Sequence, residues 1–292
     1  MSGRLPTASL TRLTAPETTE AEFPTHARFA LDNLDQLTSR PEQIKVLRQT
    51  ILNLAVRGKL VEQDPADEPV EAALQRLHVN DFPEGAFEIP ESWSWIDVDA
   101  VAQSRLGKML DRGKNKGSLR PYLRNINVRW FDFDLSDLLE MPFEDSELGE
   151  FSLRLGDVLI CEGGEPGRAA VWDDRCQNIY FQKAIHRVRF IDSVCPHYFV
   201  LALKASADDG RLEASFTGTG IKHFTGKGLR AYRFPLPPLA EQHRIITNVN
   251  GLMAMCDRLE DAFTTGHRIG TRFLESLLQM ALDFDSTIVE IA

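Results

Sequence analysis

The residues best suited to bind a ligand form a strongly basic window between positions 105 and 129. The window holds eight basic residues against one acidic residue, Asp111, so its local charge is +7 in a chain whose formal net charge is −10. Its basic members are Arg105, Lys108, Arg112, Lys114, Lys116, Arg120, Arg124 and Arg129. Several glycines predict a loop, and Tyr122, Asn125 and Asn127 follow on a strand expected over residues 122–128.

This basic window favours contact with DNA. Basic side chains on a glycine-rich loop can follow a phosphate backbone, and Arg and Asn can form paired hydrogen bonds with guanine or adenine edges. The net charge argues against a protein that coats nucleic acid indiscriminately, but it leaves room for a local basic site. The alternative interpretation of the window is a solvated surface loop.

A second candidate is the glycine-rich segment 217–227, TGTGIKHFTGK. Small and hydroxyl residues expose backbone N–H groups, and basic side chains add donors, so such a loop can hold a phosphate. The residues expected to contact DNA are Thr217, Thr219, Lys222, His223 and Lys227. The segment is not a Walker loop, because a glycine follows the last lysine. The alternative is a structural turn that joins a domain to the helix that follows.

The segment 156–167 contains carboxylates beside glycine turns. Asp157, Glu162 and Glu165 could hold Mg²⁺ in a nuclease, although no lysine lies two or three residues beyond them. A strand–turn–strand is the alternative use of these residues. The chain lacks GxSxG, HExxH, a dinucleotide GxGxxG and the Asn-Pro-Pro-aromatic motif of amino-methyltransferases. The residues alone therefore predict no metal and no catalytic group on this chain, apart from this weak nuclease alternative.

The segment 237–282 predicts one long helix. Apolar residues recur at alternating steps of four and three, which keeps one seam of a helix against a partner helix. The seam residues expected to contact a partner are Ile245, Val249, Leu252, Cys256, Leu259, Phe263, Phe273 and Leu277. The alternative is a helical hairpin that turns at Gly266 and Gly270.

The rest of the chain predicts an α+β fold with helices at both ends. We expect a flexible tail over 1–24, a helical segment over 25–80, an α/β domain over 81–236, the long helix over 237–285, and a tail over 286–292. Strands are expected at 93–98, 122–128, 157–161, 169–172 and 185–190, and helices at 26–37, 44–54, 70–77 and 197–205. The helix at 44–54 carries an apolar face that could pack against the long helix.

The four cysteines show no ligand spacing, and the sequence has no signal peptide or apolar run of spanning length. Free thiols, a cytoplasmic location and no membrane partner are therefore expected.

Four stretches, in this order, resemble the specificity subunits of Type I restriction–modification systems. They are AVRGKLVEQDPADEP (55–69), IPESWSWIDVDAV (89–101), GDVLICEGGEPGRAAV (156–171) with QNIYFQKAIHRVR (177–189), and FTGTGIKHFTGKGLRAYRFPLPPLAEQHRII (216–246). The usual member of this family has two target-recognition domains separated by helices. This sequence has one such domain with a helical segment on each side, which indicates a half-size form.

The resemblance implies a non-catalytic subunit that binds double-stranded DNA, a methyltransferase subunit and a restriction subunit. The implied cofactors of the complex, S-adenosylmethionine, ATP and Mg, would lie on other chains. Two half-size copies could pair through their helices and recognise a split, symmetric site. Two alternatives from other classes are the Mg-dependent DNA nuclease and a coiled-coil adaptor without a DNA role.

Overall fold

The computed structural model describes residues 12, 25, 26, 28, 29, 41–111 and 113–289 of the 292-residue chain. The chain divides into two compact units. One is Leu52–Val249, called here the globular unit, and the other comprises Met1–Ile51 and Asn250–Ala292, called here the helical unit. The division falls inside helices α4 (Pro41–Val56) and α10 (Leu239–Val289), whereas the sequence predicts domain boundaries after residues 80 and 236.

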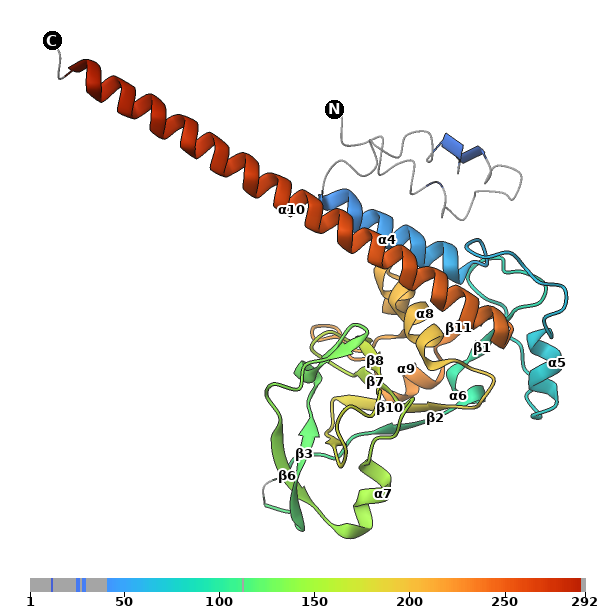
Figure 1. Cartoon of the computed structure of the whole chain (residues 1–292). Coiled ribbons are helices and arrows are strands. Elements are labelled where there is room, and N and C mark those ends of the chain that lie inside the picture. The colour runs from blue at the N-terminus through green and yellow to red at the C-terminus, as the bar shows by residue number, and fades with distance from the viewer. Residues whose placement is uncertain (1–11, 13–24, 27, 30–40, 112, 290–292) are drawn as a thin grey trace. The chain divides into compact units, whose positions relative to one another are not determined.

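The globular unit is built on a four-stranded antiparallel sheet in the order β2–β10–β7–β8 (Figure 1). Its strands are β2 (Ala102–Leu106), β10 (Ile185–Phe190), β7 (Val158–Cys161) and β8 (Ala169–Val171). All four residues of β7 are buried, because this apolar strand lies inside the sheet. Helix α8 (Pro196–Asp208) contacts β8. The expected strands at 157–161, 169–172 and 185–190 and the helix at 197–205 are confirmed, while β2 was not predicted.

A second sheet has three strands in the order β6–β3–β9, with β3 and β9 parallel. These are β6 (Leu139–Phe143), β3 (Ser118–Leu123) and β9 (Tyr180–Phe181). Aromatic rings from both sheets enter one buried cluster: Phe143 and Tyr180 of this sheet have ring centroids 4.7 Å apart, and Trp172, which follows β8, is completely buried. The two sheets therefore share one hydrophobic core.

The strand predicted over 122–128 is wrong beyond Leu123. The chain leaves β3, forms a 3₁₀ turn at Asn125–Asn127, and continues into a hairpin of β4 (Val128–Arg129) and β5 (Asp132–Phe133). The reason is a side-chain hydrogen bond: Asn127 Oδ1 accepts from the backbone N–H of Arg124 at 2.8 Å. Such local bonding offers the backbone an alternative to a strand ladder.

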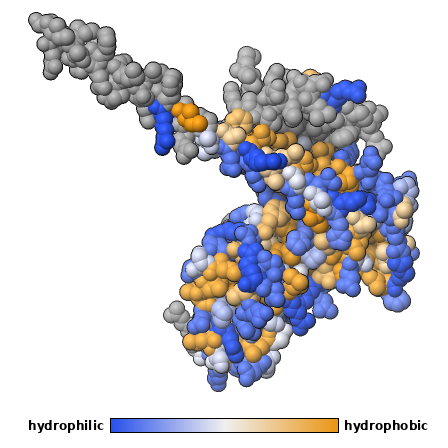
Figure 2. Space-filling view, in the orientation of Figure 1, coloured by the Kyte–Doolittle hydropathy of each residue, from blue (hydrophilic) through white to orange (hydrophobic). Residues whose placement is uncertain are grey.

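The remaining short elements connect these sheets. They are α5 (Val70–Gln75), β1 (Ser94–Asp97), α6 (Val98–Val101), η2 (Asp145–Glu147), α7 (Leu148–Phe151), η3 (Arg211–Ser215), α9 (Gly226–Arg230) and β11 (Arg233–Leu236). β1 and β11 form an antiparallel pair. Hydrophilic and hydrophobic residues are interspersed over the visible face of the globular unit (Figure 2).

Two adjacent side chains anchor the first turn of α10 within the globular unit. Glu241 accepts hydrogen bonds from Trp93 Nε1 at 2.9 Å and from Gln63 Nε2 at 2.6 Å. Gln242 is fully buried; its Oε1 accepts from the backbone N–H of Cys195 at 2.7 Å, and its Nε2 donates to two backbone carbonyls. Both side chains therefore hold the helix start to Gln63, to Trp93 just before β1, and to the loop before α8.

In the helical unit, α4 and α10 lie side by side (Figure 1). Arg48 donates to the carbonyl of Met253 at 3.4 Å and forms ion pairs with Asp257 and Glu260 at 2.7 and 2.9 Å. The predicted packing of these two helices is confirmed. Helix α10 continues without a break to Val289, so the long helix is confirmed, the hairpin alternative is wrong, and the helix passes the end predicted at 285.

The predicted partner seam needs a correction. Ile245, Val249 and Cys256 are buried within this single chain, so the chain itself covers them and they are not exposed for a partner. Leu252 and Phe263 are half-buried, and Leu259 is exposed. The side chains of Phe273 and Leu277 lie outside those described, as do the predicted tail at 1–24 and most of the predicted helix at 26–37. Within the described residues, no helix has the length and apolar content needed to cross a membrane.

The anchor at Gln242 is testable by substitution. We expect Gln242→Ala to lower the free energy of unfolding by about 2–3 kcal/mol, because three buried or partly buried backbone groups lose their partner. Urea denaturation measures this. The control Asn248→Ala, at an exposed position of the same helix, should change it by less than about 0.5 kcal/mol. Equal stabilities of the two variants would contradict the anchoring role.

Candidate nucleic-acid interface

The predicted basic window does not act as one surface. Lys108 is only 8% exposed, its Nζ donates to the carbonyl of Pro142 at 2.9 Å, and it forms an ion pair with Glu147. Its Nζ also lies 4.9 Å from the ring centroid of Phe143. The prediction that Lys108 contacts DNA is therefore corrected. Its ammonium group is paired inside the fold, where it links η2 to β6.

Other members of the window are divided between internal partners and solvent. Arg105 on β2 forms an ion pair with Glu150 and lies over the Phe151 ring. Arg120 is half-buried on β3. Lys114 and Lys116 are exposed, with Lys114 Nζ 3.6 Å from Asp111. The placement of Arg112 lies outside the described residues.

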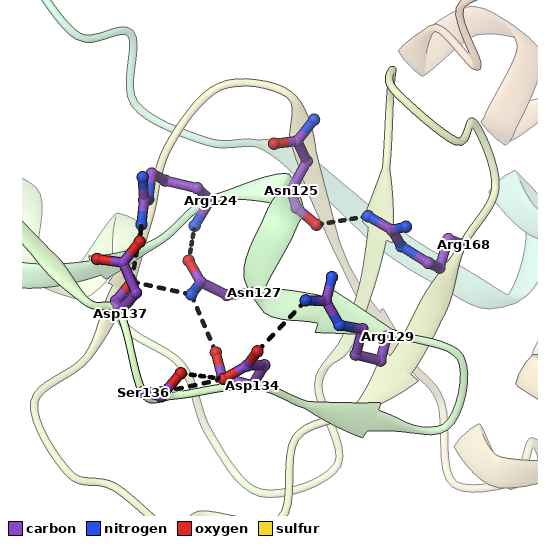
Figure 3. Close-up of polar contacts among 8 residues, drawn as sticks. All are labelled: Arg124, Asn125, Asn127, Arg129, Asp134, Ser136, Asp137 and Arg168. Atoms are coloured by element: carbon purple, nitrogen blue, oxygen red, sulfur yellow. Dashed lines mark hydrogen bonds and ion pairs between the residues drawn. The ribbon is translucent and has the colours of Figure 1, made fainter.

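The chain after β3 forms a polar network rather than the expected strand (Figure 3). Asn127, 2% exposed, donates from Nδ2 to the carbonyls of Asp134 and Asp137 at 2.9 and 3.1 Å. Arg124 pairs with the carboxylate of Asp137 at 2.6 Å, and Arg129 reaches Asp134 at 3.3 Å. Tyr122 is buried in the core beneath this network. Tyr122 and Asn127 are therefore structural, which corrects their assignment as DNA contacts.

Asn125 differs from its neighbours, since its side chain points away from this network (Figure 3). Its backbone carbonyl accepts from Arg168 Nη2 at 2.8 Å, and its side-chain Nδ2 donates to the carbonyl of Gly163 at 3.3 Å. The residue is half-buried, and the next residue, Ile126, is 45% exposed. Asn125 and Ile126 thus form the exposed tip of the 3₁₀ turn.

The glycine turn at Gly163 and Gly164 brings the two predicted DNA segments together. A Cβ on Gly164, whose φ is +81°, would lie 2.9 Å from Asn125 Nδ2. A Cβ on Gly163 would lie 3.3 Å from His223 Nδ1. The 3₁₀ turn and the segment 217–227 therefore flank the same turn, where the positive φ of Gly164 favours glycine.

The segment 217–227 is a closed turn with exposed side chains. The backbones of Thr217 and His223 bond to each other in both directions at 2.9 Å, and the N–H of Phe224 donates to the carbonyl of Glu162 at 2.8 Å. Thr219, Lys222, His223 and Lys227 are exposed. The turn is therefore a structural joint with the chain at Glu162, and it also presents two lysines to solvent.

His186 on β10 supports this joint from inside the fold. Its Nε2 lies 2.9 Å from the carbonyl of Phe224, and since a carbonyl only accepts, Nε2 carries the proton. The side chain is 1% exposed. Burial lowers the pKa of His186, while the hydrogen bond to Phe224 and the charge of Glu162 act in the opposite direction.

The carboxylates of segment 156–167 do not converge. Asp157 is buried and pairs with Arg189 at 2.6 Å. Glu165 accepts from Arg168 at 2.8 Å and from Trp130 Nε1 at 2.8 Å. Across the part of the chain that the structure describes, no three His, Cys, Asp or Glu side chains gather as metal ligands do. Strand–turn–strand is the use that the structure gives to these residues.

Sequence reasoning missed Arg168, Trp130, Ile126 and Gly163 as parts of this surface. The glycine pair was visible, because EGGEPG reads as a turn beside a strand. Nothing in the sequence places Arg168 against Asn125, since the two are 43 residues apart. We call the 3₁₀ tip, the Gly163–Gly164 turn and the segment 217–227 the composite surface.

Comparison with known proteins identifies related chains. Residues 147–262 match the profile of a family described as the Type I restriction modification DNA specificity domain. The Type I restriction enzyme EcoAI specificity subunit of Escherichia coli is 25% identical over 285 residues, covering 86% of this chain and 47% of its own length. The EcoKI specificity subunit of Escherichia coli K12 is 26% identical over 240 residues, covering 79% and 48%. This chain spans about half the length of these curated relatives.

Two solved structures are also similar. The HsdS subunit from Thermoanaerobacter tengcongensis has a TM-score of 0.46 and 18% identity, and the match covers 80% of this chain and 52% of that one. A structure of a type I R-M system has a TM-score of 0.49 and 17% identity, covering 82% and 54%.

The buried position of Lys108 is testable. We expect Lys108→Ala to lower the free energy of unfolding by about 2–3 kcal/mol, because the carbonyl of Pro142 and the carboxylate of Glu147 lose their partner. The control Lys114→Ala removes an equal charge from an exposed side chain and should cost less than about 0.5 kcal/mol. Urea denaturation of both variants measures the difference, and equal losses would show that Lys108 is not structural.

The burial of His186 predicts a pH dependence. A pKa lowered below the ordinary value of about 6.5 means that the unfolded chain binds this proton more readily, so stability is lost as pH falls below about 6.5. Burial lowers the pKa of His197 too, with the same sign. We expect His186→Asn to lose less stability than the wild type between about pH 7.5 and about pH 5.5.

Urea denaturation at several pH values measures this dependence. The control is Asn248→Ala, which removes an exposed, non-titrating side chain and should leave the wild-type pH dependence unchanged. An equally steep loss of stability in His186→Asn and in the wild type would show that this histidine does not titrate on unfolding.

Proposed function

We propose that the chain is a specificity subunit of the Type I restriction–modification family and that it recognises a specific DNA sequence. The observation that carries the proposal is the match of residues 147–262 to the DNA specificity domain. That span contains the Gly163–Gly164 turn and the segment 217–227, which are two of the three parts of the composite surface.

The composite surface suits DNA because it combines two kinds of contact. Lys222 and Lys227 are exposed cations on a glycine-rich turn, which suits phosphate oxygens. Asn125 offers a carboxamide, the group that pairs with base edges. The exposed Lys114, Lys116 and Arg129 would add contacts along the duplex. The acidic remainder of the chain would then limit contact with DNA to this surface.

In this proposal the chain is a non-catalytic subunit that directs other chains to their site. A methyltransferase subunit would bind it and perform the methyl transfer with S-adenosylmethionine. A restriction subunit that uses ATP and Mg would join the same complex. Two of the three carboxylates that the nuclease alternative needed, Asp157 and Glu165, are engaged with Arg189, Arg168 and Trp130.

The proposal includes pairing of two copies. The described part of the chain contains one globular unit, so in this proposal each copy supplies one recognition domain. Met255, Leu259 and Ile269 are exposed apolar residues on α10 and would form the contact between copies. A two-fold pair imposes matching half-sites, so the recognised site would be symmetric and interrupted.

Copurification followed by mapping of methylated bases tests the proposed function. The full chain is expressed with a candidate methyltransferase subunit, and the methylated positions in genomic DNA are then sequenced. We expect a stable complex and methylation at a split symmetric site. Cleavage of DNA by the purified chain with Mg²⁺ alone, or a stable complex that methylates without sequence preference, would overturn the proposal.

The phosphate contact of the basic loop is separately testable. We expect Lys116→Ala to weaken DNA binding by the full chain and to make the slope of log affinity against log salt less steep by about one. Fluorescence anisotropy over a series of salt concentrations measures the slope. Lys45→Ala removes an exposed lysine from α4 and serves as the control. Identical slopes for Lys116→Ala and wild type would exclude Lys116 from the interface.

A further inference from the structure

The carboxamide of Asn125 is held by the fold but is only partly bonded. Nδ2 makes one hydrogen bond, at 3.3 Å to the carbonyl of Gly163. Among the hydrogen bonds within the described part of the chain, none uses Oδ1 of Asn125. The neighbouring Asn127 uses both ends of its carboxamide inside the protein. Two asparagines two residues apart therefore differ: one closes the turn, and the other keeps bonding capacity for a ligand.

The backbone of Asn125 is fixed by a chain of polar contacts. Arg168 Nη2 donates to the Asn125 carbonyl at 2.8 Å, and Glu165 accepts from Arg168 Nη1 at 2.8 Å. The other carboxylate oxygen of Glu165 accepts from Trp130 Nε1 at 2.8 Å, and Lys204 Nζ lies 5.4 Å from that ring. Such supporting contacts hold a recognition group in one orientation before the ligand arrives, which lowers the cost of binding.

The surroundings of Asn125 leave room for a duplex to approach. Gly163 and Gly164 present backbone alone on one side. On the tip itself, Ile126 is an exposed apolar side chain next to the carboxamide. Lys222, across the Gly163–Gly164 turn and adjacent to His223, supplies a cation at the edge of the surface. A carboxamide beside an exposed aliphatic group, flanked by a cation, matches the groups that a base pair and its phosphate present.

We propose that Asn125 and Ile126 together read one A·T base pair in the major groove, an inference that rests on the proposed function. Oδ1 of Asn125 would accept from adenine N6, and Nδ2 would exchange its long bond to Gly163 for one to adenine N7. The Ile126 side chain would contact the methyl group of the paired thymine. Arg168 and Glu165 are positioning residues, since they act on the base only through Asn125.

Selection from a pool of random duplexes tests the inference. The full wild-type chain and the variants Asn125→Ala, Asn125→Asp and Ile126→Ala are each used to enrich sequences, which are then compared position by position. We expect the wild type to select a sequence with an invariant A·T pair. Asn125→Ala should lose preference at that pair alone, and binding of the wild-type sequence should weaken about tenfold to hundredfold with an unchanged salt slope.

The other variants keep the test decisive. Asn125→Asp has nearly the same shape as the wild type but no N–H donor, so it should lose the adenine preference even if Asn125→Ala folds poorly. Ile126→Ala should weaken the discrimination at the same pair. Asn80→Ala, at an exposed loop asparagine, should select the wild-type sequence. Thermal unfolding of every variant reports whether it is folded.

The outcomes separate this inference from the proposed function. If the wild type selects a sequence and the folded Asn125 variants select the same one, the inference fails and the proposed function stands. If the Asn125 variants instead lose a copurifying protein while keeping the selected sequence, the tip is a protein contact and the inference fails too. If the wild type enriches no sequence at all, both are overturned.

Discussion

The composite surface depends on one buried carboxamide, that of Asn127. Its Oδ1 accepts from the backbone N–H of Arg124, so that N–H is not available to extend the strand pairing of β3. Its Nδ2 donates to two backbone carbonyls in the chain after β5. With every polar atom of this side chain paired, burial costs little and the turn has a single geometry. Asn125 and Ile126 reach the surface because this turn ends β3.

A basic side chain in this protein is not necessarily free to bind a ligand. The basic window has the composition of a DNA-binding loop, but five of its cations meet carboxylates of the same chain. The pairs are Lys108 with Glu147, Arg105 with Glu150, Arg124 with Asp137, Arg129 with Asp134 and Lys114 with Asp111. A paired cation has already exchanged its hydration for a protein contact, so it has less to gain from a phosphate. Among the described residues, the exposed Lys116, Lys222 and Lys227 form no ion pair with a carboxylate, so they are the lysines most available to a polyanion.

The start of α10 belongs to the globular unit through its side chains. Glu241 and Gln242 are buried next to each other and point to different partners, Trp93 and Gln63 for one, Cys195 and Ser193 for the other. Burial raises the pKa of Glu241, and its two hydrogen-bond donors act against that shift. A helix held at two adjacent positions cannot rotate about its own axis, so the orientation of its first turns is set by the globular unit.

The sequence by itself determined the parts of this protein that depend on local patterns. The heptad spacing predicts the unbroken helix through Gly266 and Gly270, the apolar run predicts the buried strand β7, and the order of four stretches predicts the family. These features can be predicted because the residues that determine them lie close together in the chain, so that hydrophobic periodicity and turn-forming residues are enough to identify them.

Only the tertiary structure decided which of the predicted residues face solvent. Lys108 and Lys116 are equivalent in composition, and their difference arises because Pro142 and Glu147 lie against one of them. Likewise Asn125 and Asn127 differ because Arg168, 43 residues beyond Asn125, holds one backbone, while Asp134 and Asp137 occupy the other side chain. Such pairings follow from long-range packing of the strands, and no local period of the sequence encodes which charges will meet.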